Sequence, residues 1–246
     1  MRVALVQLNV HDPLWSLSGI QKVLMSASDI DLVVFPEYLP FDEKTPNKLA
    51  VRELEMISAS CPDVPFIAGG SVVVDGKLRN AVFLCEQGKV VDHYYKRILW
   101  HEEEYVPGTQ TKLFVWSRGR CVPLICADAS DNPSPTGTRM MYEAIKAGAG
   151  PDVPIVVCTY GARFFEEYWQ LPLQTWATGC DANVLVCAVS GKGNEYTDDD
   201  ESLGHFGGGG SGLFRPGLNT KPLQRVHRGI CVVDTVSATL AFQKLP

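Results

Sequence analysis

The chain has 246 residues, of which 46% are hydrophobic and 20% are charged, a balance typical of a folded protein with a sizeable core. Its 28 acidic residues outnumber its 22 basic residues, which gives a net charge of −6, and the basic residues are scattered along the chain. These features argue against nucleic acid or an anionic membrane surface as a partner.

The first half of the chain alternates between segments of strand and helix type. Short apolar runs predict strands at 3–8 and 32–35. Apolar residues at helical spacing predict two helices, one on Leu17, Ile20, Leu24 and Ala27 and one on Ala50, Leu54, Ile57 and Cys61. The strand at 66–74 then begins an antiparallel meander, with hairpin turns predicted at Asp75-Gly76 and at Glu86-Gln87-Gly88.

The second half repeats this alternation. Strands are predicted at 122–126, 154–160 and 183–189, and the polar segments 128–137 and 191–212 are expected to be loops. Two helices are predicted, one on Met141, Ala144, Ile145 and Gly148 and one on Leu173, Trp176, Ala177 and Cys180. The order of elements predicts an α/β fold with a mixed sheet covered by helices, in a single domain over 1–246.

Three polar residues each follow an apolar strand. Glu37 comes after LVVF, Lys96 after VVDHYY, and Cys126 after VPLI. Strand ends are where an α/β scaffold assembles chemistry, because side chains there are fixed without being fully covered. A thiol needs a base to become a nucleophile, and the oxyanion it creates needs a positive charge or another donor. The three residues together supply these roles. Taken singly, Cys126 is more typical of core packing and Lys96 of a solvated strand end, and Glu37 could cap a turn.

Five segments in chain order together resemble the carbon–nitrogen hydrolase (nitrilase) superfamily. FPEYLP is similar to the segment around its catalytic glutamate, and 67–97 is similar to its glycine-led meander ending in Y-x-K. VPLICADAS resembles the strand that ends in its nucleophilic cysteine. GAGPDVPIVVCTYGA and GGSGLFRPG are similar to two later strands. The resemblance covers nearly the whole chain.

This resemblance implies a four-layer αββα sandwich and an amidase or nitrilase. Cys126 would attack an amide carbonyl or nitrile carbon, and Glu37 would act as general base. Lys96 and the backbone N–H of Ala127 would hold the oxyanion. The family often has a second glutamate, and alignment with HEEEYVPG selects Glu104, whose expected role is to orient Lys96 and the substrate.

Substrate residues are expected on loops beside these segments. Tyr38, Tyr160 and Arg163 are the candidates, and Arg163 could bind a substrate carboxylate with two parallel hydrogen bonds. The chain departs from the family pattern after Cys126, because the family's nearby arginine is absent and the first basic residue is Arg139.

Three alternatives to a Glu-Lys-Cys hydrolase remain. The segment YYKRILWHEEEYVP resembles the apolipoprotein N-acyltransferase branch, which indicates a soluble N-acyltransferase with the same cysteine intermediate. A base supplied by His101 or His205 would make a Cys-His hydrolase. An inactive binding homologue would keep the fold without turnover.

The remaining expectations concern ligands, thiols and location. The five histidines lack paired metal spacing and the eight cysteines form no CxxC pair, so no metal or disulfide is expected. No cofactor is predicted, since GHFGGGGSG lacks the lysine and the strand-to-helix context of a phosphate loop. A chain start without signal-peptide features predicts a cytoplasmic protein, and no apolar run is long enough to span a membrane. The family resemblance implies a homo-oligomer acting on a small-molecule amide or nitrile.

Overall fold

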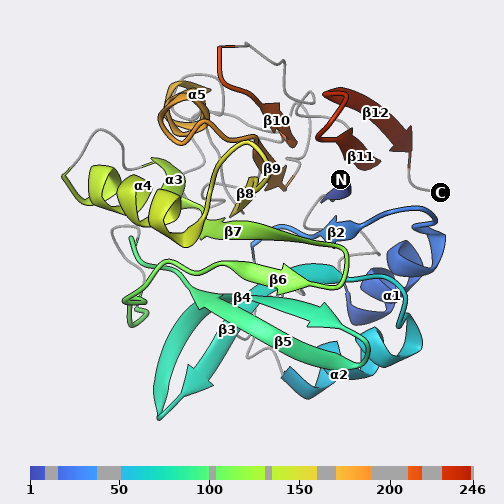
Figure 1. The fold of residues 1–246 in the computed structure, drawn as a ribbon. Coiled ribbons are helices and arrows are strands. Elements are labelled where there is room, and N and C mark those ends of the chain that lie inside the picture. The colour runs from blue at the N-terminus through green and yellow to red at the C-terminus, as the bar shows by residue number, and fades with distance from the viewer. Residues whose placement is uncertain are drawn as a thin grey trace, which may run out of the picture.

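The computed structural model describes residues 1–8, 16–37, 51–99, 104–130, 135–159, 170–189, 210–217 and 229–244. In these residues, two β-sheets pack against each other and helices lie on their outer sides (Figure 1). The layers therefore form the α/β sandwich that the family resemblance implies.

The larger sheet has seven strands in the order β12-β11-β1-β2-β3-β4-β5. Its strands are β1 (Arg2–Gln7), β2 (Leu32–Val34), β3 (Phe66–Val74), β4 (Lys77–Glu86), β5 (Lys89–Tyr95), β11 (Gly229–Asp234) and β12 (Thr239–Lys244). The pairs β1-β2 and β2-β3 are parallel, whereas β3-β4-β5 is the predicted antiparallel meander. The sheet is therefore mixed, as expected.

The smaller sheet has five strands in the order β10-β9-β8-β7-β6. Its strands are β6 (Phe114–Trp116), β7 (Gly119–Ile125), β8 (Ile155–Thr159), β9 (Val184–Ala188) and β10 (Gly212–Phe214). Its centre, β7-β8-β9, is parallel. Parallel strands covered on both faces are built from near-continuous apolar runs, and all residues of β8 and β9 are buried.

Helices cover the outer face of each sheet. On the larger sheet lie α1 (Leu17–Ser26) and α2 (Val51–Ser60), which bury Ile20, Leu24, Leu54 and Ile57 in one core cluster. On the smaller sheet lie α4 (Pro135–Ala147) and α5 (Gln170–Gly179), which bury Met140, Ala144, Leu173 and Trp176. The spacing of 3.6 residues per turn explains these buried stripes.

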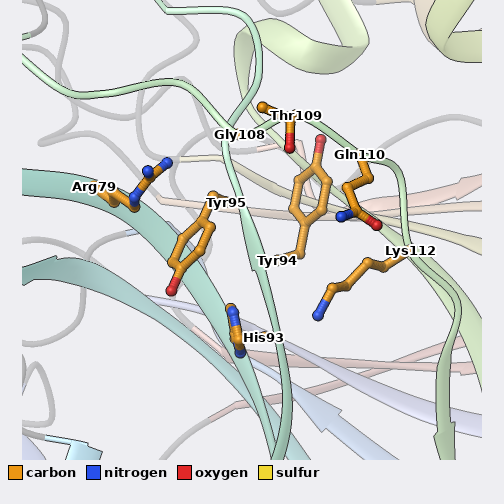
Figure 2. A pocket seen from close by; sticks show the side chains of 8 residues that line it. All are labelled: Arg79, His93, Tyr94, Tyr95, Gly108, Thr109, Gln110 and Lys112. Atoms are coloured by element: carbon orange, nitrogen blue, oxygen red, sulfur yellow. The ribbon is translucent and has the colours of Figure 1, made fainter. Parts of the chain in front are cut away.

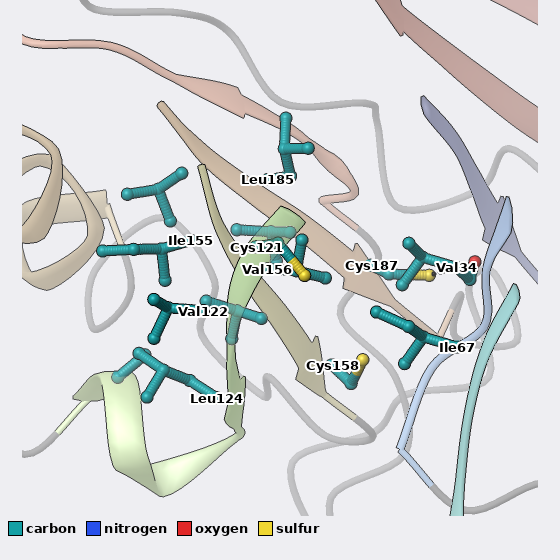
Figure 3. Close-up of a cluster of buried hydrophobic side chains, with 14 of the residues drawn as sticks. Val34, Ile67, Cys121, Val122, Leu124, Ile155, Val156, Cys158, Leu185 and Cys187 are labelled. Carbon is teal, nitrogen blue, oxygen red and sulfur yellow. Dashed lines mark hydrogen bonds between the residues drawn. The ribbon is translucent and has the colours of Figure 1, made fainter. Parts of the chain in front are cut away.

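The core between the sheets includes many aliphatic and cysteine side chains, some of which Figure 3 shows. Val34 and Ile67 of the larger sheet lie beside Cys158 and Cys187 of the smaller one. All eight cysteines of the chain are free, as predicted, and seven of them are buried. A free thiol packs as a small apolar group, so these cysteines are core residues.

The two predicted hairpin turns are confirmed. Asp75 and Gly76 between β3 and β4 have φ of 51° and 73°, and Gln87 and Gly88 between β4 and β5 have φ of 50° and 81°. Two successive residues with positive φ form the tight turn whose twist matches that of the flanking strands. The meander places Lys96 directly after the third of these strands.

The expected loop at 128–137 is wrong in part. A short helix, α3 (Ala127–Ser130), begins directly after Cys126, and α4 begins at Pro135. Proline is favoured in the first helical turn because its fixed φ suits the helix and its missing N–H has no partner there in any case. The face predicted for α4 is also shifted, since Met140 is buried whereas Ile145 is 43% exposed.

Candidate active site

Glu37 and Lys96 form a buried ion pair. Glu37 follows β2, Lys96 follows β5, and the Lys96 Nζ donates to Glu37 Oε1 at 3.1 Å. Each residue is only 1% exposed. Two charges buried this deeply persist only when they are paired and hydrogen-bonded, so the strand ends hold a carboxylate and an ammonium in fixed contact.

Asn80 on β4 completes this contact. Its Nδ2 donates to the same Oε1 of Glu37 at 2.7 Å, and its backbone carbonyl accepts the Lys96 N–H at 2.9 Å. On its other side, the Lys96 carbonyl accepts the N–H of Gly108 at 2.7 Å. A Cβ at position 108 would collide with the Tyr95 carbonyl oxygen, so this close approach requires glycine. The Lys96 backbone is thus held on both sides.

Cys126 lies at the turn between β7 and α3. Its φ is 43°, in the left-handed region that a non-glycine residue rarely adopts. Its N–H donates to the Cys158 carbonyl at 2.9 Å, and its own carbonyl accepts the Ala129 N–H at 2.9 Å. Such strain costs about 1–3 kcal/mol and is concentrated at functional sites.

Cys126 differs from the other cysteines in its exposure. It is partly exposed, whereas the other seven are buried. Burial raises the thiol pKa of Cys180 and Cys231 to about 12, and it raises the thiol pKa of Cys85, Cys121, Cys158 and Cys187 as well. Of the buried cysteines, Cys158 lies next to Cys126, because its carbonyl accepts the Cys126 N–H.

Asp128, in the first turn of α3, contacts the ends of β5 and β7. Its Oδ1 accepts the N–H groups of Arg97 at 3.0 Å and Ile98 at 2.7 Å. Its Oδ2 accepts the Tyr94 hydroxyl at 2.8 Å and the Ile125 N–H at 3.1 Å. Burial raises the Asp128 pKa to about 6, and the hydrogen bonds from Ile98, Tyr94 and Ile125 and the Lys96 charge oppose the rise. The same carboxylate therefore contacts residues on both sides of Lys96 and the residue before Cys126.

A hollow of about 240 Å³ lies along the edge strand β5 (Figure 2). Figure 2 shows Tyr94 and Tyr95 on opposite sides of this strand. The guanidinium carbon of Arg79 lies 4.9 Å from the centre of the Tyr95 ring. Lys112 on its rim pairs with Asp92 at 2.7 Å. Tyr94 and Gly108 of its lining also contact Asp128 and Lys96, respectively, so the hollow borders the backbone that holds Lys96.

Two of the other predicted site residues lie in the described part of the chain. Ala127 is buried at the start of α3, directly after Cys126. Glu104 is exposed, whereas Lys96, which it was expected to orient, is buried and pairs with Glu37. Tyr38, Tyr160 and Arg163 lie outside the described residues, as do His101 and His205.

Asn80, Tyr94 and Asp128 are site residues that the sequence did not indicate. Asn80 is a buried amide in β4, directly before the apolar run AVFLC. A polar residue at the start of such a run is the only signal for Asn80 that the sequence offers. Asp128 lies in a segment expected to be a loop, and Tyr94 has the pattern of an ordinary strand residue.

No cluster of three or more metal-ligating side chains occurs in the part of the chain that the structure describes. None of its described helices is long and apolar enough to cross a bilayer.

Solved structures with this fold cover most of the chain. A variant of the amidase from Nesterenkonia sp. AN1, with acrylamide added at its active-site cysteine, matches with a TM-score of 0.73 at 20% identity, over 95% of this chain and 92% of that one. Saccharomyces cerevisiae Nit3, a member of branch 10 of the nitrilase superfamily, matches with a TM-score of 0.65 at 18% identity, over 99% and 86%. These matches define a nitrilase-type α/β sandwich.

A larger protein shares the fold over part of its length. The glutamine-dependent NAD+ synthetase from Acinetobacter baumannii matches with a TM-score of 0.71 at 16% identity, over 100% of this chain and 48% of that one. The comparison with curated proteins found no matching sequence. The family model described as carbon-nitrogen hydrolase matches residues 2–151. The chain therefore belongs to the carbon-nitrogen hydrolase family and is an enzyme of the amidase or nitrilase type.

Proposed function

We propose that this chain hydrolyses a non-peptide carbon–nitrogen bond, with Cys126 as nucleophile, Glu37 as general base and Lys96 as oxyanion ligand. The substrate class comprises small amides, ω-amides, N-carbamoyl compounds and nitriles. One observation carries the proposal: the end of β5, where Lys96 pairs with the buried Glu37 at 3.1 Å, is tied by Asp128 to the turn of the partly exposed Cys126. A carboxylate, an ammonium and a thiol are the groups that acyl transfer through a thioester needs.

The reaction begins with proton transfer from the Cys126 thiol to Glu37. The thiolate attacks the amide carbon, and the resulting oxyanion accepts hydrogen bonds from the Lys96 ammonium and the Ala127 N–H. When the intermediate collapses, the carbon–nitrogen bond breaks and Glu37 gives its proton to the departing amine or ammonia. A thioester remains on Cys126.

The second half of the reaction releases the acid. Glu37 takes a proton from water, and the hydroxide formed attacks the thioester carbonyl. The carbon–sulfur bond then breaks, the carboxylic acid leaves, and the proton returns to the Cys126 sulfur. Glu37 therefore accepts and then releases two protons, the first from the thiol and the second from water. Its hydrogen bonds to Lys96 and Asn80 fix the orientation of its carboxylate during these transfers.

The other site assignments remain part of the proposal. Tyr38, Tyr160 and Arg163 are proposed to bind the substrate, and Glu104 is proposed to be the second carboxylate, which orients Lys96 and the bound substrate. A single domain over 1–246, a homo-oligomeric state and a cytoplasmic location stay predictions from the sequence.

Acyl transfer to an amine is the second candidate function. The segment YYKRILWHEEEYVP favours it, because it resembles the N-acyltransferase branch around Lys96 and Glu104. The same thioester would then be attacked by an amine in place of water, with Glu37 taking the amine proton. Competition between water and an added primary amine distinguishes the two functions.

The test is ammonia release from a panel of acetamide, glutamine, an N-carbamoyl amino acid and a nitrile. Glutamine is included because one solved structure of this fold is a glutamine-dependent enzyme. We expect release from at least one compound by the wild-type chain and none from Cys126→Ala. Cys158→Ala, which removes a buried thiol beside the site, is the matched control and should keep the activity. Release that survives in Cys126→Ala would contradict the proposal, and silence on the whole panel would favour acyl transfer or a binding role.

A further inference from the structure

Asp128 is a fully buried carboxylate for which the proposed chemistry has no direct use. It accepts four hydrogen bonds, two on each oxygen, from three backbone N–H groups and the Tyr94 hydroxyl. An ionised carboxylate has about four acceptor positions, so the number of donors matches its capacity. The backbone donors cannot turn to become acceptors, and this makes the site specific for a carboxylate.

The four donors come from the two sheets of the sandwich. Tyr94 is the penultimate residue of β5 on the larger sheet, and Arg97 and Ile98 come after that strand, so these three residues flank Lys96. Ile125 is the last residue of β7 on the smaller sheet and precedes Cys126. One side chain thereby joins the segment that carries the ammonium to the turn that carries the thiol.

A second contact ties the same segment to α4. Glu143 accepts hydrogen bonds from the Arg97 guanidinium and from Arg139, the latter at 2.9 Å. The Thr111 hydroxyl donates a third hydrogen bond to Glu143, at 3.3 Å. Arg97 is therefore fixed through its backbone by α3 and through its side chain by α4, the two helices that follow Cys126.

We propose that Asp128 is a positioning residue that sets the distance between the Lys96 ammonium and the Cys126 thiol. This inference rests on the proposed function, because it gives those two groups a joint task. Reacting groups must be held within about 0.5 Å of their productive geometry. A displacement of about 1 Å can cost about a hundredfold in rate.

Asp128→Asn tests the proposal with almost no change in size. The amide nitrogen would face either the N–H groups of Arg97 and Ile98 or that of Ile125, and donor would then meet donor. We expect kcat to fall by about ten- to a hundredfold while KM changes by less than about threefold. Tyr94→Phe removes one of the four hydrogen bonds and should lower kcat by about threefold to tenfold.

Alkylation of Cys126 by iodoacetamide supplies a readout that needs no amide substrate. The rate follows the thiolate fraction, and a nearby ammonium stabilises the thiolate. In Asp128→Asn we expect the midpoint of the pH profile of alkylation to rise. Asp234→Asn is the control, because Asp234 also accepts two backbone N–H groups, from Val236 at 2.8 Å and Ser237 at 3.1 Å, in an exposed turn after β11.

The outcomes separate the two proposals. A folded Asp128→Asn protein with wild-type kcat and alkylation profile would overturn the positioning role and leave the hydrolase proposal standing. If Asp128→Asn does not fold, Tyr94→Phe decides by the same two readouts, and no change in either overturns the role. A shifted alkylation profile in a protein that releases no ammonia would support positioning while contradicting the proposed hydrolysis.

Discussion

On the larger sheet the proposed catalytic groups are held by side-chain contacts, whereas on the smaller sheet Cys126 is held by its backbone. Glu37 and Lys96 are buried and bind each other and Asn80. Cys126 is partly exposed and sits at a φ of 43° between a strand and a short helix. The larger sheet thus holds the two charged groups away from water, while the smaller one leaves the proposed nucleophile partly exposed.

This difference explains why the groups on the larger sheet and the cysteine turn on the smaller sheet need a connection. A buried ion pair is rigid but gains nothing for catalysis unless the thiol lies at the right distance from it. The cysteine turn is strained, and strain persists only where the surrounding structure fixes it. Asp128 supplies fixed contacts to both halves. Substitutions in one sheet, or in the Asp128 connection, therefore distinguish what each contributes.

The largest effect is expected from Glu37→Gln on the larger sheet. The amide keeps the size of the side chain but cannot take the thiol proton, and loss of a general base typically costs about 10²–10⁴ in rate. Steady-state kinetics on the substrate found in the panel measures this loss. Glu53→Gln, an exposed position in the first turn of α2, is the control and should be unchanged. Full activity in Glu37→Gln would instead favour a histidine base, His101 or His205.

Lys96→Ala is expected to have the next largest effect. Loss of one oxyanion donor typically lowers kcat by about 10²–10³. The change also leaves the buried Glu37 without its cation, which should lower the free energy of unfolding by about 3–5 kcal/mol. Kinetics and urea denaturation of the same preparation measure both quantities.

Lys112→Ala is the matched control for Lys96→Ala. Lys112 also pairs with a carboxylate, Asp92 at 2.7 Å, but both side chains are 31% exposed. An exposed pair contributes only about 0–1 kcal/mol, so stability and kcat should stay near the wild-type values. Equal losses in the two variants would mean that burial of the Lys96 pair has no special role.

The position of a polar residue after an apolar strand led to the candidate residues on both sheets, but it gave no sign of the Asp128 connection between the sheets. Glu37, Lys96 and Cys126 each follow a short apolar strand, and that pattern is local, so it could be recognised in the sequence. Asn80 binds Glu37 across 43 positions of sequence and Asp128 binds Arg97 across 31, and no local pattern encodes such contacts. The polar residues after Asp128 are typical of a loop, and a helix of one turn is too short to show a helical pattern in the sequence.

The fold was predictable to a similar extent. Hairpin turns and apolar runs predicted β3, β4 and β5 because their pairing partners are neighbours in sequence. The pairing of β1 with β11 joins Arg2 to Asp234, and it depends on contacts that only the assembled sheet provides. The two-sheet sandwich was accordingly implied by resemblance to a family, whereas periodicity alone predicted only a mixed sheet with helices.

The pH dependence of stability and of activity tests the Asp128 connection itself. The Asp128 pKa is raised from 3.8 to about 6 in the folded chain, chiefly because burial disfavours the charge. The folded state therefore holds this proton more tightly than the unfolded state does. The contribution of Asp128 to the free energy of unfolding is greatest below about pH 4 and decreases as the pH rises through about 6, by about 3 kcal/mol in all.

Activity should change in the opposite direction over the same range. Only the ionised carboxylate accepts all four donors, so kcat should rise as Asp128 ionises. The charged and titratable groups around Asp128 are Tyr94, Lys96 and Arg97 from the β5 side and Glu143 from α4. Subtracting the pH dependence of Asp128→Asn from that of the wild type removes their common contribution. The measurement is urea denaturation and kcat between about pH 4 and pH 7 for both proteins.

Opposite slopes would mean that a charge which destabilises the folded chain is kept because it aligns the two sheets. This combination is informative, because a residue that serves stability alone gains nothing from being ionised in a buried site. Parallel curves for the wild type and Asp128→Asn would contradict the prediction, since the four hydrogen bonds would then not depend on the charge. In that case the alignment of Cys126 with Lys96 would have to come from the second contact, between Arg97 and Glu143.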